Sequence, residues 1–271
     1  MGGKIPVLSR LLIISLLLVL SGNAYPDTDY SPGDVIFISL NQNESLLDFY
    51  YRGNLMTKVS KDDKYYLLFG VPYDTKKGEN QFIFESKKII KKITFNILKK
   101  KYPIQKIEIK KFKVKTQDEY KRISKERAEI IQAKKKIYAK FPDYMFIIPA
   151  QGPISGTYGT VRYYNGKKGN YHNGHDIAAA IGTPIYAPSS GIVMLTGDYY
   201  YNGKFVMVNH GNNLISMFLH LNDIKVKKDD VIKKGQIIGT VGTTGLSTGP
   251  HLHWSVLLNN SYIDPLKLIN N

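Results

Sequence analysis

Apolar and polar residues alternate in short runs along much of the chain, which is the pattern of β-strands with one buried face. In the carboxyl-terminal half, glycine, asparagine or charged residues separate these runs. They predict strands over residues 184–187, 191–195, 204–208, 214–219, 237–241 and 251–257. Asn202-Gly203 predicts a hairpin turn between two such runs, because both residues tolerate a positive φ. We therefore expect an antiparallel β-structure here, with a groove across the sheet and no long helix.

A second β region precedes it. Alternating runs over residues 34–40, 65–71, 80–85 and 92–98 predict strands within the segment 25–115, which is long enough to bury a core of its own. We expect a small β-sandwich there. The chain is thus mainly β, with an amino-terminal β-sandwich-like domain ahead of an antiparallel β-sheet domain over residues 149–271.

One helix is expected between the two β regions. Over residues 118–139 the apolar positions Tyr120, Ile123, Ile130 and Ile137 recur at spacings of three and seven, among charged residues. Glutamates interrupt the basic face, which argues against a membrane-binding helix. Residues 116–148 are therefore predicted to be a connecting helix and linker.

The first 24 residues predict export. Lys4 and Arg10 precede the apolar run 11–20, and the small residues of 21–24 form a cleavage site of the secretory type. The apolar run is short for a membrane span, although an uncleaved anchor stays open. The chain has no cysteine, so neither lipidation nor a disulfide is expected. We expect a signal peptide over residues 1–24 and a periplasmic protein.

Positive charge is concentrated in the amino-terminal half of a chain with a net charge of +16. Between Lys87 and Lys115 there are 12 lysines and one acidic residue, Glu108. This excess predicts an anionic partner, such as a wall polymer or an anionic lipid, because the export signal argues against nucleic acid. The alternative is that the lysines only solvate strand edges.

All six histidines lie between His172 and His253. His251 and His253 are two residues apart on a predicted strand, so both point to the same face. Zinc hydrolases use two or three imidazoles, often a carboxylate, and leave one position open. A ligand set of His172, Asp176 and His253 fits that pattern. The alternative is that each histidine packs or caps on its own.

The same residues resemble the lysostaphin-type family of zinc peptidases. The family's His-x-x-x-Asp motif is matched over 172–176, and its His-x-His motif over 251–253 after a glycine-rich stretch. His220 matches the additional catalytic histidine of the family, although Phe218 stands where a tyrosine is usual. The resemblance covers residues 149–271, and residues 70–78 resemble the domain that precedes the peptidase in Gram-negative members.

The resemblance implies that His172, Asp176 and His253 hold Zn²⁺ and that His220 and His251 are catalytic. His251 is expected to act as general base or acid and His220 to stabilise the oxyanion, with the order of the two left open. The implied activity is hydrolysis of peptide bonds in peptidoglycan stem peptides, as a D,D-endopeptidase acting on cross-links. Polyglycine bridges and a carboxypeptidase cut remain open.

A second function class is a catalytically silent wall-binding regulator that activates an amidase. Members of that kind lose zinc ligands, whereas all three are present here. A third candidate is a biotinyl or lipoyl carrier, because residues 187–193 and 231–239 resemble its strands. Lys204, at the hairpin tip, lacks the flanking residues of a modified lysine. The sequence leaves the oligomeric state open.

Four further residues lie close to these motifs. His175 is expected to face away from Asp176, since neighbours in a strand alternate. His210 ends an alternating run at a glycine and is expected to be a buried, hydrogen-bonded structural residue. Arg162 and Tyr171 are candidates for the lining of the cleft.

Overall fold

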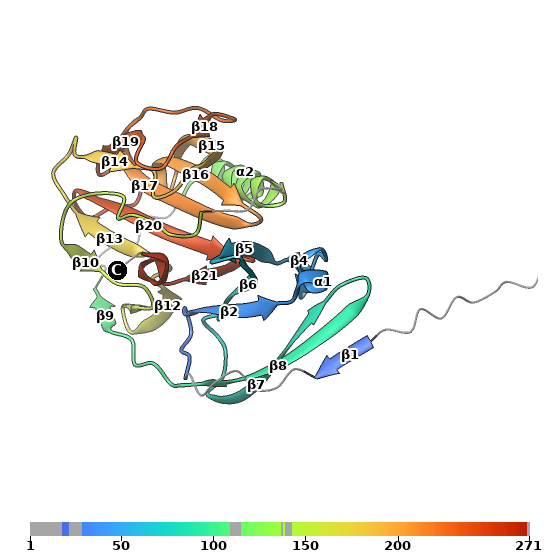
Figure 1. Cartoon of the computed structure of the whole chain (residues 1–271). Helices are drawn as coiled ribbons and strands as arrows, with labels where there is room; N and C mark the ends of the chain where they lie inside the picture. The colour runs from blue at the N-terminus through green and yellow to red at the C-terminus, as the bar shows by residue number, and fades with distance from the viewer. Residues whose placement is uncertain (1–17, 22–28, 109–114, 137, 139–142, 270–271) are drawn as a thin grey trace, which may run out of the picture.

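The computed structural model describes residues 18–21, 29–108, 115–136, 138 and 143–269 (Figure 1). The expected signal peptide falls largely outside these ranges and stays a prediction; only its residues 18–21 are described, as strand β1. No helix within the described ranges is long and apolar enough to cross a membrane. The fold is mainly β, as expected.

Two sheets form a sandwich in the amino-terminal part. The first has the order β1-β8-β7-β3-β4 and the second the order β2-β6-β5. Their bounds are β1 Leu18–Ser21, β2 Val35–Leu40, β3 Tyr50–Tyr51, β4 Asn54–Leu55, β5 Thr57–Lys61, β6 Lys64–Gly70, β7 Gly78–Glu85 and β8 Ile89–Ile97, with the short helix α1 over Gln42–Ser45. Alternation explains the core, because Phe82 and Phe84 on β7 and Phe69 on β6 point between the sheets and are buried.

Helix α2 runs over Gln117–Lys134 and ends before Ala139, the predicted end. Thr116 caps it, in a capping box with Glu119. The helix lies on the outer side of the carboxyl-terminal sheet (Figure 1). There Glu126 accepts a hydrogen bond of 2.9 Å from the backbone N–H of Tyr200, and Glu129 accepts one from the hydroxyl of Tyr199.

A ten-stranded sheet dominates the carboxyl-terminal part. Its main path is β10-β13-β20-β17-β16-β15-β18, and every pair in it is antiparallel. The bounds are β10 Ile154–Gly156, β13 His175–Ala178, β14 Pro184–Tyr186, β15 Gly191–Tyr199, β16 Gly203–Gly211, β17 Leu214–Ile224, β18 Val231–Ile232, β19 Ile237–Val241, β20 His251–Leu258 and β21 Ser261–Ile263, followed by the 3₁₀ helix η1 Pro265–Leu268. The predicted hairpin is present. Because Tyr199 pairs with Gly203, its turn comprises residues 200–202, so Asn202 lies in the turn as predicted and Gly203 is already the first residue of β16.

A fourth sheet, of three strands, joins the two parts of the chain. It has the order β12-β11-β9, with bounds β9 Ile104–Ile107, β11 Val161–Tyr164 and β12 Lys167–Tyr171. β9 pairs with β11 in parallel, so that Ile104 lies opposite Val161. A strand from within the predicted segment 25–115 thus completes a sheet beside the metal-binding motifs, and the domain boundaries themselves stay a prediction.

The two parts also share a hydrophobic core. Val59 and Leu68 of the amino-terminal sandwich belong to the same buried cluster as Phe218 and Trp254 of the large sheet. Around it, the Asn259 side-chain amide donates to Thr57 Oγ1 at 3.1 Å. The amino-terminal sandwich is therefore packed against the large sheet, and this packing fixes the position of the residues that border the metal-binding motifs.

Candidate metal centre

Three strands bring the predicted ligands together. Asp176 on β13 lies directly opposite His253 on β20 in the antiparallel register, so their side chains are cross-strand neighbours. His172 follows the end of β12 and precedes β13. The sequence separation between His172 and His253 is thus closed by strand pairing.

Three donor atoms converge at this point. His172 Nε2 lies 3.0 Å from Asp176 Oδ1 and 3.0 Å from His253 Nδ1, and His253 Nδ1 lies 2.9 Å from Asp176 Oδ1. A tetrahedral zinc ion with bonds of about 2.0–2.1 Å needs ligand atoms roughly 3.3 Å apart. Two imidazoles and one carboxylate at this spacing fit a divalent metal ion and are consistent with zinc.

Hydrogen bonds fix the orientation of both ligand rings. His172 Nδ1 lies 3.0 Å from the carbonyl oxygen of Thr157, and His253 Nε2 lies 3.1 Å from Asn173 Oδ1. Both partners are acceptors, so these ring nitrogens donate their N–H groups. The lone pairs of His172 Nε2 and His253 Nδ1 therefore point towards Asp176 Oδ1. All three donor atoms thus face one point, which is the arrangement expected around a metal.

Burial and hydrogen bonding set the charge state of the ligands. Burial by itself would raise the pKa of Asp176, but its contacts with His172 and His253 outweigh burial and hold that pKa well below its usual range. Burial lowers the pKa of His253. The structure thus favours an ionised carboxylate beside a neutral imidazole, which are the forms that bind a metal.

The two predicted catalytic histidines lie beside this centre. His251 Nε2 is 3.7 Å from Asp176 Oδ1, and the rings of His220 and His251 lie 4.9 Å apart between centroids. His251 Nδ1 donates to the carbonyl of Gly249 and His220 Nδ1 to that of Thr244, each at 2.8 Å. In both rings Nε2 is therefore the nitrogen free for proton transfer. Burial lowers the pKa of His220 to about 4.

The backbone at His220 is held in an uncommon conformation. Its φ is 67°, in the left-handed region that non-glycine residues rarely adopt. The N–H of His220 donates to the carbonyl of Asn202 at 3.0 Å, which ties this residue to the β15–β16 turn. Two independent anchors, on the backbone and on the ring, thus fix the direction of the His220 side chain.

A pocket of about 240 Å³ opens beside His172 and Asp176. Arg162 lines it, as expected, and its Nη2 lies 3.7 Å from Asp176 Oδ2. Gln105 of β9 also lines it, next to Arg162 in the strand register, and its Oε1 accepts a hydrogen bond of 3.2 Å from Arg162 Nε. No local sequence pattern indicated Gln105, because its position depends on the parallel pairing of β9 with β11.

Tyr171 does not line this pocket. Its ring stacks on Tyr73 of the amino-terminal part, with centroids 3.6 Å apart and an angle of 7° between the planes. Together with Tyr262 these two tyrosines border a different pocket, of about 350 Å³. Burial raises the pKa of Tyr171 to about 12, so its hydroxyl stays protonated. Tyr171 holds the two parts of the chain together next to His172.

The remaining histidines have structural roles. His175 faces away from the centre, as predicted, and its Nε2 lies 2.7 Å from Asp264 Oδ1. His210 is buried and hydrogen-bonded, as predicted: Nδ1 donates to the carbonyl of Ser190 at 2.9 Å, and Nε2 accepts from the Ser216 hydroxyl at 2.8 Å. Burial lowers the pKa of His210 to about 4.

Comparison with known proteins gives these features a family context. Residues 170–265 match peptidase family M23. The crystal structure of a candidate M23 peptidase from Pseudomonas aeruginosa is similar over 90% of this chain and 96% of that one, with a TM-score of 0.72 and 32% identity. That similarity extends beyond the metal centre to the amino-terminal part.

Curated relatives match over a shorter segment. The peptidoglycan DD-endopeptidase ShyA of Vibrio cholerae is 42% identical over 96 residues, which are 35% of this chain and 22% of the relative. The DD-carboxypeptidase/endopeptidase Mpg of Neisseria meningitidis is 36% identical over 97 residues, 36% of this chain and 22% of that protein. The chain thus matches about a fifth of the length of these relatives.

Proposed function

This chain belongs to peptidase family M23, and on that basis we propose that it is a zinc-dependent endopeptidase that hydrolyses peptide bonds in peptidoglycan. The observation that carries the proposal is the convergence of His172 Nε2, Asp176 Oδ1 and His253 Nδ1 on one point, with two further imidazoles beside it. The bond we propose is the D,D cross-link between stem peptides. ShyA, named a peptidoglycan DD-endopeptidase, and Mpg, named a DD-carboxypeptidase/endopeptidase, support this choice.

His172, Asp176 and His253 would hold the zinc ion. When bound there, zinc would act as a Lewis acid towards the scissile carbonyl and lower the pKa of the attacking water. The ligand set has a net charge of −1, because one carboxylate joins two neutral imidazoles. It leaves the ion with net positive charge for that task.

The protein's own groups would move the proton. His251 lies nearest to the ligands, and its Nε2 is free, so it would take the proton of the attacking water and deliver it to the leaving amine. His220 would stabilise the developing oxyanion from Nε2, since Nδ1 is engaged with the Thr244 carbonyl. Its ring is neutral in the free enzyme, so it would take up the proton for this bond only as the negative charge develops beside it. The substrate peptide would lie in the pocket between Arg162 and the strand that carries Ile154.

We also propose that the enzyme acts outside the inner membrane, where its substrate lies. The predicted signal peptide supports this location. The lysine-rich segment from Lys87 would then contact an anionic wall polymer or lipid.

Mass spectrometry of purified cross-linked muropeptides tests the activity. The zinc-loaded chain is expected to convert dimers to monomers, and both chelator and His251→Ala are expected to abolish this conversion. His251→Ala should still bind one zinc ion per chain, whereas His253→Ala should not. A zinc-loaded, folded chain that leaves every dimer intact would contradict the proposed activity, and a His253→Ala variant with full zinc content would contradict the ligand set.

A further inference from the structure

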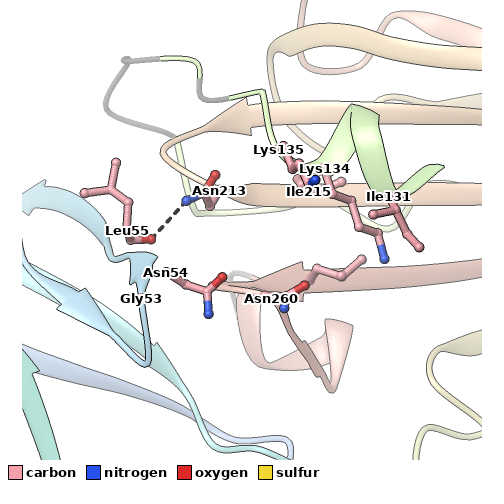
Figure 2. Close-up of a pocket in the computed structure, with 10 residues that line it drawn as sticks. Gly53, Asn54, Leu55, Ile131, Lys134, Lys135, Asn213, Ile215 and Asn260 are labelled. Atoms are coloured by element: carbon pink, nitrogen blue, oxygen red, sulfur yellow. Dashed lines mark hydrogen bonds between the residues drawn. The ribbon is translucent and has the colours of Figure 1, made fainter. Parts of the chain in front are cut away.

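A second cavity, of about 480 Å³, lies away from the metal centre where three parts of the chain meet (Figure 2). The β3–β4 turn of the amino-terminal sandwich forms one wall. The last turn of α2 forms the second wall, and the ends of β17 and β20 form the third. Its volume is in the range of sites for small molecules.

The cavity has an apolar side and a polar side. Ile131 of α2, Ile215 of β17 and Leu257 of β20 provide apolar surface. Asn54 and Asn260 provide side-chain amides on the opposite side, and Figure 2 shows both projecting from turns below α2. Such a surface suits a ligand with an apolar body and a polar end.

The lining residues carry only positive charge. Lys134 and Lys135 line the cavity, and among the described residues that line it there is no aspartate or glutamate. The carboxyl end of α2 has a partial negative charge of its own, so these two lysines are the groups that would attract an anion.

Lys134 lines the cavity and has no carboxylate partner among the described residues. It is partly buried, and its Nζ lies 5.3 Å from the ring centroid of Tyr262; within the described ranges no carboxylate oxygen is within 4 Å of it. Two other partly buried lysines do have carboxylate partners: Lys91 pairs with Glu44 at 2.7 Å and Lys58 with Asp48 at 3.4 Å. Burial lowers the pKa of Lys134, as expected for an ammonium group without a counter-charge.

Hydrogen bonds between the two parts of the chain hold the walls in place. The side-chain amide of Asn213 donates to the carbonyl of Leu55 at 3.0 Å, as the dashed line in Figure 2 shows. Asn259 donates to the same carbonyl at 3.2 Å. The cavity is therefore formed before any ligand arrives, which reduces the entropic cost of binding.

We propose that this cavity binds a small organic carboxylate, such as the carboxyl end of a short peptide. The carboxylate would pair with Lys134, and the apolar body would lie on Ile131, Ile215 and Leu257. Inorganic phosphate could form an ion pair with Lys134 but would leave the apolar side of the cavity exposed to water. This site is separate from the metal centre, and the proposal does not depend on the peptidase activity.

The probes are N-acetyl-leucine and its uncharged analogue N-acetyl-leucinamide, titrated into the zinc-loaded full chain and followed by methyl NMR. We expect N-acetyl-leucine to shift the methyl signals of Ile131, Ile215 and Leu257 and to bind at least about tenfold more tightly than the amide. Lys134→Gln should bind N-acetyl-leucine about tenfold more weakly than the wild type, and Lys134→Arg should bind it as tightly as the wild type. Lys136→Gln is the matched control, because Lys136 is exposed and does not line the cavity.

Four results would overturn the proposal. These are equal affinity for the acid and the amide, unchanged affinity in Lys134→Gln, tighter binding of inorganic phosphate than of N-acetyl-leucine, and shifts confined to residues around His172. The last result would place the carboxylate on the zinc ion. Native methyl dispersion in Lys134→Gln shows that any lost binding does not come from unfolding.

Discussion

Asn173 Oδ1 accepts a hydrogen bond of 3.1 Å from His253 Nε2, which leaves the other ring nitrogen of His253 facing Asp176 and His172. Asn173 is also hydrogen-bonded through its side chain to the Tyr262 hydroxyl. A residue between the first ligand and Asp176 in the sequence thus orients the ligand that comes from β20. Hydrogen-bond partners of this kind orient a ligand ring and raise its basicity, and both effects strengthen metal binding.

Asn173→Ala is expected to weaken zinc binding by about 10–100-fold, because the His253 ring loses the acceptor that fixes its tautomer. Competition with a chelator of known affinity measures this change. Asn173→Asp retains an acceptor oxygen and should bind zinc more tightly than the alanine variant. Equal zinc affinity in the wild type and Asn173→Ala would show that the hydrogen bond has no role in metal binding.

Gly156→Ala is expected to abolish zinc binding. A Cβ at this position would lie 2.3 Å from Asp176 Oδ2, so the carboxylate would have to move away from the two imidazoles. Gly249→Ala is the matched control, since a Cβ there meets nothing within 4 Å. Metal analysis of the two purified variants checks the prediction, and full zinc content in Gly156→Ala would contradict it.

Protonation of His210 is expected to lower the stability of the fold in acid, independently of the metal. Its folded pKa of about 4 lies below the ordinary value of 6.5, so below that value the unfolded chain takes up a proton that the folded chain does not. The contribution is fully present above pH 6.5 and is lost as the pH falls towards 4, by about 3 kcal/mol in total.

Urea unfolding at a series of pH values measures this contribution. The free energy of unfolding of His210→Gln should fall less steeply between pH 7 and pH 4 than that of the wild type. Parallel pH profiles for the two proteins would assign the acid sensitivity to other groups, such as His220.

Tyr73→Ala is expected to lower the free energy of unfolding by about 2 kcal/mol, because it removes the ring that stacks on Tyr171 at 3.6 Å. Tyr50→Ala removes a tyrosine that is 38% exposed and should change stability by no more than about 0.5 kcal/mol. Urea unfolding of both variants tests the difference, and equal effects would mean that the stack does not fasten the two parts together.

Local patterns predicted the β-rich fold and several residues of the candidate site. The alternation rule placed His251 and His253 on one side of β20 and turned His175 away from Asp176, because strand geometry depends only on neighbouring positions. The His-x-x-x-Asp and His-x-His spacings identified the three residues that the structure brings together.

Other parts of the site were not predictable from local patterns. The carbonyl of Thr157 and the side chain of Gln105 reach the site through loop and strand pairings between distant residues, and neither residue type indicates such a contact. Tyr171 was expected in the cleft, but stacking on a tyrosine from the amino-terminal part places it elsewhere. The end of α2 was placed too far along the chain, since apolar spacing alone does not define where a helix stops.

Because β9 pairs in parallel with β11, residues 149–271 alone do not form the complete cleft. A fragment that starts at Pro149 would lack Gln105, the partner of Arg162, and would present β11 as an open edge. Unpaired edges invite association between copies, so such a fragment would be prone to self-association and would present Arg162 without its restraint. Substrate preference measured on the isolated carboxyl-terminal segment would then be a property of that fragment alone. The intact chain would show a different substrate preference.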